Sequence, residues 1–217
     1  MKFFVDTVDI EEVKASKKLG LADGITTNPT LIQKSGLDFK KTIIELANEI
    51  KGPVNAEVTE IDTVDSIIQQ GREFSGWAEN VTIKIPISIQ GLQAVRVLET
   101  EGIKTTVTLI FSPNQALLAA KAGASYICPF VGRLDDISVP GMNLIGEIVN
   151  IYNNFSSIKT EIIVASLRTS IHVLDSALLG ADGVTVPFKI IKQLVSHPLT
   201  DIGITRFRED WDKVTNK

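Results

Sequence analysis

Lys84 is the residue of this chain whose type and setting point most directly to chemistry. It lies in the apolar run 81–86, which is rich in β-branched residues and predicts a strand. Side chains alternate between the faces of a strand, so Lys84 points away from the face shared by Ile83 and Ile85. If the lysine face is buried, loss of hydration lowers the pKa of the ammonium group, and the neutral amine can attack a carbonyl to form a Schiff base. The alternative is an exposed edge strand whose lysine blocks pairing with another chain.

Other polar side chains stand at or just after the ends of predicted strands. Each has an ordinary explanation, such as a turn cap for a carboxylate or a surface position for an arginine. Together they would supply carboxylates, an amide, hydroxyls and guanidinium groups to one end of a sheet. They are Asp6, Asn28, Glu57, Thr108, Arg133, Ser166 and Arg168.

This set of side chains suits one type of reaction. A Schiff base withdraws electrons, so that a neighbouring C–C bond can break, and the accompanying proton transfers require carboxylates at different places. Asp6 and Glu57 are candidates for these transfers. Arg133 and Arg168 would hold a phosphate group by charge-assisted hydrogen bonds, with Ser166 as a neutral donor.

The elements that must position these residues alternate along the whole chain. Strands are predicted at 2–6, 24–27, 54–58, 81–85, 105–109, 126–130, 162–165 and 183–186. Helices are predicted at 10–19, after the capping residue Asp9, and at 92–101, 114–122 and 171–179, the last three stopping at glycines. Eight strand–helix units favour a (β/α)8 TIM barrel over an open doubly wound sheet. No GxGxxG motif follows the first strand, which argues against the dinucleotide-binding form of the open sheet.

Residues 1–217 are expected to form a single barrel domain, because barrels of about this length commonly do not divide. The segment 201–217, which carries Phe207 and Trp211, follows the eighth unit and predicts an additional C-terminal helix. The two aromatic residues are four positions apart and share a helix face. This face would pack either on its own barrel or on a neighbouring subunit.

Composition excludes several classes of function. A net charge of −4 argues against general nucleic-acid binding, and no apolar run is long enough to span a bilayer. The acidic Asp6 follows the start of the chain too closely for a signal peptide. The single cysteine, Cys128, excludes an internal disulfide and suits a reducing cytoplasm. His172 and His197 lie too far apart for a standard zinc motif. We expect no metal site, a cytoplasmic location, and no catalytic role for His172.

Taken in order, the motifs resemble the transaldolases, specifically the small subfamily close to the fructose-6-phosphate aldolases. The resemblance covers essentially the whole chain. The matching motifs lie at 4–7, 24–30, 83–86, 108–112, 129–133 and 164–168. The last five include the Thr-Thr-Asn-Pro-Thr, Ile-Lys-Ile-Pro and Pro-Phe-Val-Gly-Arg runs, whose order and spacing are specific.

The resemblance implies a (β/α)8 barrel without metal or organic cofactor. It implies transfer of a dihydroxyacetone unit from sedoheptulose 7-phosphate to glyceraldehyde 3-phosphate, giving erythrose 4-phosphate and fructose 6-phosphate in the pentose phosphate pathway. Lys84 matches the Schiff-base lysine, Asp6 the acid/base at the breaking bond, and Glu57 and Thr108 the residues that position the catalytic water. The expected substrate-binding positions are Thr27, Asn28, Thr106, Phe130, Arg133, Ser166 and Arg168.

Two positions favour transaldolase over aldolase. The related aldolases usually carry glutamine in place of Glu57 and tyrosine in place of Phe130. Thr106 and Cys128 depart from the asparagine and serine of larger transaldolases, which leaves substrate preference open. Cys128 is expected to be a buried strand residue rather than a reactive thiol.

Three alternatives stay open from the sequence: aldolase-type cleavage to free dihydroxyacetone and glyceraldehyde 3-phosphate, a sugar-phosphate-binding barrel without turnover, and a scaffold protein. The resemblance also implies a homo-oligomer, a pentamer or a decamer of two pentamers, in which the terminal helix reaches a neighbouring subunit. Sugar phosphates are the expected partners, without nucleic acid or membrane.

Overall fold

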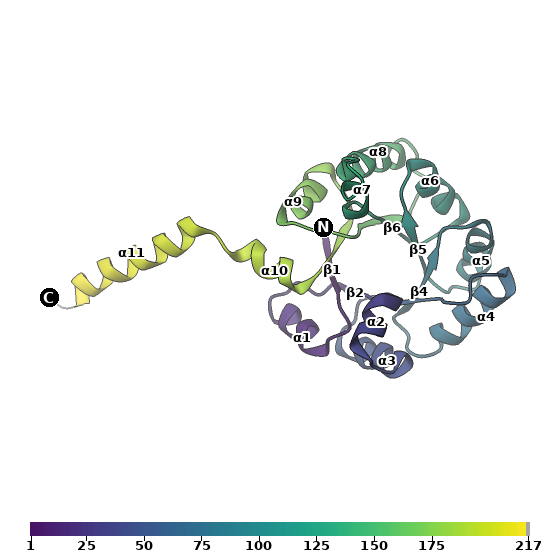
Figure 1. Ribbon diagram of the computed structural model, residues 1–217, viewed down its shortest axis with the longest axis horizontal. Helices are drawn as coiled ribbons and strands as arrows, with labels where there is room; N and C mark the ends of the chain where they lie inside the picture. Colours follow the sequence, from purple (N-terminus) through teal and green to yellow (C-terminus); the bar gives the residue numbers. More distant parts are fainter. Residues whose placement is uncertain (216–217) are drawn as a thin grey trace.

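The computed structural model describes residues 1–215, in which eight parallel strands close into a barrel with helices around it (Figure 1). Neighbouring strands pair in chain order, and β8 pairs with β1. The predicted (β/α)8 barrel with an additional C-terminal helix is therefore confirmed. The strands are β1 Lys2–Asp6, β2 Gly24–Thr26, β3 Val54–Glu57, β4 Val81–Pro86, β5 Thr105–Ile110, β6 Tyr126–Pro129, β7 Glu161–Val164 and β8 Gly183–Val186.

The helices follow the strands as the alternating pattern requires. They are α1 Ile10–Lys18, α2 Pro29–Ser35, α3 Phe39–Glu49, α4 Val64–Ser75, α5 Ile89–Thr100, α6 Pro113–Ala122, α7 Gly132–Asp135, α8 Gly141–Asn153, α9 Ser170–Leu179, α10 Phe188–Val195 and α11 Pro198–Thr215. Asp9 caps α1 as predicted, because its carboxylate accepts a hydrogen bond from the amide of Glu11 at 2.8 Å. Gly123 and Gly180 end α6 and α9 in the left-handed conformation, which a glycine adopts without strain.

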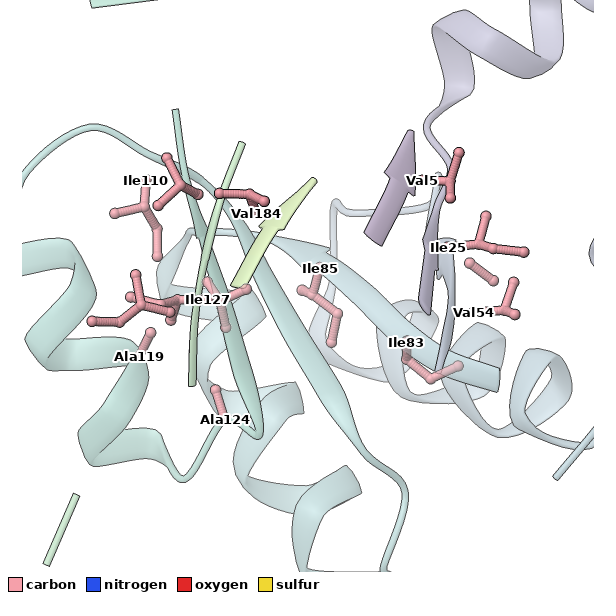
Figure 2. Packing of buried hydrophobic residues seen from close by; sticks show 14 of the residues in the cluster. Val5, Ile25, Val54, Ile83, Ile85, Ile110, Ala119, Ala124, Ile127 and Val184 are labelled. Carbon is pink, nitrogen blue, oxygen red and sulfur yellow. The ribbon is translucent and has the colours of Figure 1, made fainter. Parts of the chain in front are cut away.

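Two separate apolar layers hold the barrel together. The larger one lies between the strands and the helices and includes Val5, Ile25 and Ile83, which Figure 2 shows among its neighbours. The smaller layer contains Phe4, Tyr126, Cys128, Ile163 and Ala165. Alternation explains the division, since residues next to each other on a strand point to opposite faces. One face of each strand faces the helices and the other faces the inside of the barrel.

The predicted element ends are shifted by one to three residues in several places. The helix predicted at 92–101 begins at Ile89, because the Ser88 side chain accepts a hydrogen bond from the amide of Gly91. The register between β5 and β6 shifts between Val107 and Ile110, and Leu109 there has a φ of 59°. This irregularity lies at the end of the barrel where the polar residues gather.

The C-terminal helix α11 extends away from the barrel (Figure 1). It begins at Pro198, three residues before the predicted start at position 201, because proline fits the first turn of a helix and the His197 ring accepts the amide of Leu199 at 3.2 Å. None of the residues in α11 is buried. Asn216 and Lys217, which end the predicted helix segment, lie outside the described residues. Within residues 1–215, no helix has the length and apolar character needed to cross a membrane.

Candidate active site

A cavity of about 440 Å³ opens at the carboxyl ends of the strands, where chemistry gathers in barrels of this type. It brings together nine of the eleven side chains predicted for the site. They are Asp6, Asn28, Glu57, Lys84, Thr108, Phe130, Arg133, Ser166 and Arg168. The strands that supply them are distant in sequence, so the closed barrel is what makes them neighbours.

Lys84 is buried inside the barrel with only 4% of its surface exposed. Its Nζ atom donates a hydrogen bond to the carbonyl oxygen of Thr27 at 2.9 Å and lies 2.9 Å from Oε2 of Glu57. The alternative of an exposed edge-strand lysine is wrong, because β4 is paired on both sides. A buried amine that retains two oxygen partners and faces a cavity is held in one place and accessible to a ligand.

Asp6 lies at the end of β1 and accepts a hydrogen bond from the Thr26 hydroxyl at 3.0 Å. Burial raises the pKa of its carboxyl group, while the charge of Lys84 and the Thr26 hydrogen bond act in the opposite direction. A carboxyl group that holds its proton to higher pH than usual is suited to donate and accept protons.

Glu57 and Thr108 lie on either side of Lys84, on β3 and β5. Lys84 pairs with Glu57 and with Thr106 across the two neighbouring strands. The hydroxyl oxygens of Thr106 and Thr108 are buried without a hydrogen-bond partner among residues 1–215. Such groups normally bind something polar, so Thr108, which lines the cavity, is available to an oxygen atom of a ligand or of solvent.

Thr27 and Thr106 do not line the cavity. The Thr27 hydroxyl donates to the carbonyl oxygen of Asn55 at 2.8 Å, and its own carbonyl oxygen holds Lys84. Thr27 therefore supports the lysine from behind through its backbone. Thr106 is fully buried beside Lys84, one layer below the opening.

Asn28 combines a structural contact with a position in the cavity. Its side-chain oxygen accepts the amide of Leu31 at 3.0 Å and caps α2. The Asn-Pro pair thus begins a helix, with Asn28 as the cap and Pro29 in the first turn. Capping uses the amide oxygen and leaves the amide nitrogen to donate toward the cavity that Asn28 lines.

The cationic side of the cavity is formed by the segments after β6 and β7. The Arg133 guanidinium lies 5.2 Å from the centre of the Phe130 ring, a cation–π contact. Phe130 in turn packs edge-on against Phe111, with ring centres 5.7 Å apart. Ser166 has a φ of 61°, a left-handed conformation that costs strain in residues other than glycine and is enriched at functional sites. Arg133, Ser166 and Arg168 thus present donors to one side of the cavity.

The sequence reasoning missed Thr26 and Thr185, which both line the cavity. Their hydroxyl oxygens are hydrogen-bonded to each other, and Thr26 also donates to Asp6. Alternation along β2 was the signal that would have found Thr26, because Ile25 is in the outer layer and its neighbour must face the interior. The same rule places Thr185 between Val184 and Val186.

Cys128 lies on the barrel interior and lines the cavity. Burial raises the pKa of its thiol to about 12, so that the thiol carries its proton at neutral pH. This agrees with the expected buried strand residue and argues against a reactive thiol. Among the described residues, no group of three or more histidine, cysteine or acidic residues is arranged to hold a metal ion.

Comparison with solved structures gives the fold independently. Thiamine phosphate pyrophosphorylase from Pyrococcus furiosus superposes with a TM-score of 0.55 over 86% of this chain and 85% of that one, at 20% identity. At this identity, the similarity shows a shared fold and nothing more about function.

Comparison of sequences is more specific. A protein of Aquifex aeolicus named probable transaldolase is 56% identical to this chain over 217 residues, which cover 100% of this chain and 99% of that protein. Proteins of the same name from Geotalea uraniireducens and Methanococcus maripaludis are 54% and 53% identical, over 99% and 100% of this chain and 99% and 100% of their own. The model of the family Transaldolase/Fructose-6-phosphate aldolase matches residues 3–217. The chain therefore belongs to the transaldolase/fructose-6-phosphate aldolase family of enzymes.

Proposed function

We propose that this enzyme transfers a dihydroxyacetone unit between sugar phosphates through a Schiff base on Lys84. The reaction would convert sedoheptulose 7-phosphate and glyceraldehyde 3-phosphate into erythrose 4-phosphate and fructose 6-phosphate, as in the pentose phosphate pathway. The observation that carries the proposal is the buried Lys84 beside Glu57, at a cavity that also contains Asp6 and a cationic side. The relatives named probable transaldolase support the same reaction class.

The first half of the proposed reaction forms the Schiff base. Nζ of Lys84 would first give a proton to the Glu57 carboxylate and then, as a neutral amine, attack the ketone carbon of the donor sugar; the carbinolamine that forms loses its oxygen as water. Glu57, whose carboxylate lies 2.9 Å from Nζ, would exchange the protons of this step through a water molecule that Thr108 also holds. The Thr27 carbonyl fixes the direction in which the amine approaches.

The second half breaks and remakes a C–C bond. Asp6 would take the proton from the donor hydroxyl next to the bond, and the bonding electrons move into the iminium group as the first aldehyde leaves. The resulting carbanion-like intermediate stays bound to Lys84 until an acceptor aldehyde arrives. The same steps in reverse then form the new bond, protonate the new hydroxyl from Asp6 and hydrolyse the Schiff base.

The phosphate of the substrate would lie against Arg133, Ser166 and Arg168. Two guanidinium groups and a hydroxyl at one side of a cavity match the charge and the acceptors of a phosphate group. Asn28 would donate to a hydroxyl of the dihydroxyacetone part. Thr27 and Thr106 were both predicted to bind substrate. Thr27 would act indirectly, through the carbonyl oxygen that holds Lys84, and Thr106 from its position beside the lysine.

Aldolase-type cleavage, with release of free dihydroxyacetone, is the second candidate. Glu57 and Phe130 favour transfer, because a carboxylate can activate water and a phenyl ring offers no proton to the intermediate. A barrel that only binds sugar phosphates would need the arginines but not Lys84 with its two carboxylates.

We also propose a homo-oligomer, a pentamer or a decamer, and a cytoplasmic location. The exposed apolar side chains of α11 support assembly, since Phe207 and Trp211 are 75% and 65% exposed on a helix that has no buried residue of its own. A free and buried Cys128 is compatible with a reducing compartment.

Mass spectrometry of the intact protein tests the proposed chemistry. The wild-type chain is incubated with fructose 6-phosphate and borohydride, and the modified residue is then located by peptide mapping. A dihydroxyacetone-sized addition confined to Lys84, and absent in Lys84→Ala, is the expected result. No addition, under conditions in which a known enzyme of this class gives one, would overturn the Schiff-base mechanism.

A further inference from the structure

The segments that carry the two arginines of the cavity, Arg133 and Arg168, are joined directly by backbone hydrogen bonds. The amides of Val131 and Gly132 donate to the carbonyl oxygens of Ala165 and Ser166, at 3.1 and 3.0 Å. A Cβ atom on Gly132 would lie 2.2 Å from the carbonyl oxygen of Ser166 and 2.7 Å from Nε of Arg168. Only glycine allows α7 to approach the 165–168 segment this closely.

His172 adds a second connection between the same segments. Its Nδ1 atom accepts the backbone amide of Arg168 at 3.2 Å, and its Nε2 atom lies 3.0 Å from Oδ2 of Asp135 in α7. The other oxygen of Asp135 accepts the amide of Gly141 at 2.9 Å, at the start of α8. The ring therefore links the β7–α9 segment to α7 and, through Asp135, to α8.

The two ring nitrogens have different partners. Nδ1 accepts the hydrogen bond from the Arg168 amide, and Nε2 lies within contact distance of the Asp135 carboxylate. The side chain is 13% exposed and does not line the cavity. His172 thus contacts the backbone of a cavity residue without reaching any ligand itself.

The side chain of Arg168 has a separate contact with the same part of the fold. Its guanidinium donates to Oδ2 of Asp136 at 2.9 Å, and both side chains are more than half exposed. An ion pair as exposed as this one contributes little on its own and leaves the guanidinium free to turn. The contact of His172 with the Arg168 amide, rather than this ion pair, holds the backbone from which the arginine side chain extends.

We propose that His172 is a positioning residue for the phosphate-binding side of the cavity. By holding the Arg168 amide and Asp135 together, it keeps the 165–168 segment and α7 in the relative placement from which Arg168 and Arg133 reach one phosphate group. The proposal rests on the proposed function insofar as the ligand is a sugar phosphate. It adds a residue outside the cavity that sets affinity for the phosphate without taking part in the chemistry at Lys84.

The test compares three variants with the wild-type chain. His172→Phe keeps an aromatic ring but removes the hydrogen bond to the Arg168 amide and the polar contact with Asp135. His172→Asn keeps an acceptor for the Arg168 amide and is the conservative variant. His197→Phe is the matched control, because His197 also accepts a backbone amide through Nδ1, that of Leu199, but at the exposed start of α11. Circular dichroism establishes that each variant is folded.

Kinetics with two donor sugars, one with a phosphate group and one without, distinguish a role in positioning the phosphate site from a general structural defect. For His172→Phe, KM for fructose 6-phosphate should rise by about two- to tenfold, the ratio that one lost hydrogen bond contributes, with kcat within about twofold. The kcat/KM for unphosphorylated fructose should not change. His172→Asn should recover most of the lost affinity, and His197→Phe should match the wild type. An equal loss on both donors would overturn the positioning role.

Calorimetric titration with inorganic phosphate reads the same site without catalysis. Phosphate affinity should weaken in His172→Phe by a similar factor, and an unchanged affinity would overturn the proposal. If the wild-type chain binds no phosphate, both the phosphate site and the positioning role fail. If phosphate binds normally but Lys84 forms no adduct, only the Schiff-base chemistry fails.

Discussion

Glu57 and Lys84 face each other directly across β3 and β4, with the glutamate oxygen 2.9 Å from the lysine nitrogen. Both side chains are largely buried, at 12% and 5% side-chain exposure. A buried ion pair is a poor source of stability, because the desolvation of two charges offsets most of their attraction. The pair is therefore better explained by what the two groups do to a ligand than by what they contribute to folding.

Glu57→Gln should separate the acid/base work of this carboxylate from its contact with the lysine. The amide can still accept a hydrogen bond from Lys84 but cannot take a proton, so the rate of Schiff-base formation should fall by about 100-fold or more. Rapid mixing with borohydride trapping measures this rate. Glu60→Gln, at an exposed position just past β3, is the control and should have the wild-type rate. Equal rates for all three proteins would contradict a proton-transfer role for Glu57.

Asp6→Asn should lose activity and gain stability. Burial raises the pKa of Asp6 above its ordinary value of 3.8, so the folded chain holds this proton more tightly than the unfolded chain. The wild type therefore loses stability as pH rises from about 3.8 through the folded-state pKa, and the full loss is present above that value. The neutral amide avoids this loss, while the transfer rate should fall by about 100- to 10,000-fold.

Urea unfolding at pH 7 and near pH 4, together with steady-state kinetics, measures both effects. The stability gain of Asp6→Asn should be present at pH 7 and shrink toward pH 4. Asp9→Asn is the matched control, because asparagine caps a helix about as well as aspartate and this cap is exposed. A lower stability of Asp6→Asn at pH 7 would show that the ionised carboxylate stabilises the fold.

Phe130→Tyr should shift the balance from transfer toward cleavage. A hydroxyl at this position in the cavity can protonate the bound intermediate, which would then leave as free dihydroxyacetone. The ratio of dihydroxyacetone released to fructose 6-phosphate formed should rise by about tenfold or more, measured by chromatography of the products. Phe111→Tyr, on the ring that packs against Phe130, controls for an added hydroxyl nearby. An unchanged ratio in Phe130→Tyr would remove the proposed basis of reaction choice.

The double substitution of Phe207→Ala and Trp211→Ala should reduce the size of the assembly. These side chains share one face of α11, a helix about 27 Å long that the barrel of its own chain leaves uncovered. Light scattering coupled to size-exclusion chromatography measures the mass. Glu209→Ala, about half a turn away around the helix, should leave the mass unchanged. A monomeric wild type would rule out the proposed oligomer.

The barrel and the cavity follow from the sequence because both depend on local, repeating patterns. Alternation within 81–86 predicted that Lys84 lies on a different face from its apolar neighbours. The ends of the predicted strands indicated Asp6, Glu57 and Thr108 as site residues. The same rule applied to β2 selects Thr26 over Thr27 for the interior, so that detail was present in the sequence but unused.

Other features depend on long-range contacts and have no local signal. The helix α7 has four residues, too few to show a helical period, and its position relies on the close approach of Gly132 to Ser166. His172 contacts the Arg168 amide four positions earlier, but its second contact, Asp135, lies more than thirty positions earlier in the chain. Burial against the barrel does not fix the direction of α11, because none of its residues is buried.

The separation of the apolar residues into two layers has a consequence for how the sequence of such an enzyme can evolve. The layer between strands and helices contains most of the buried hydrophobic side chains, whereas the barrel interior contains a smaller group next to the polar cavity. Mutations that alter substrate choice can therefore accumulate on the interior face while the outer layer continues to specify the barrel. A library randomised at interior positions should retain many folded members, which makes this scaffold a practical starting point for new carbon–carbon bond-forming catalysts.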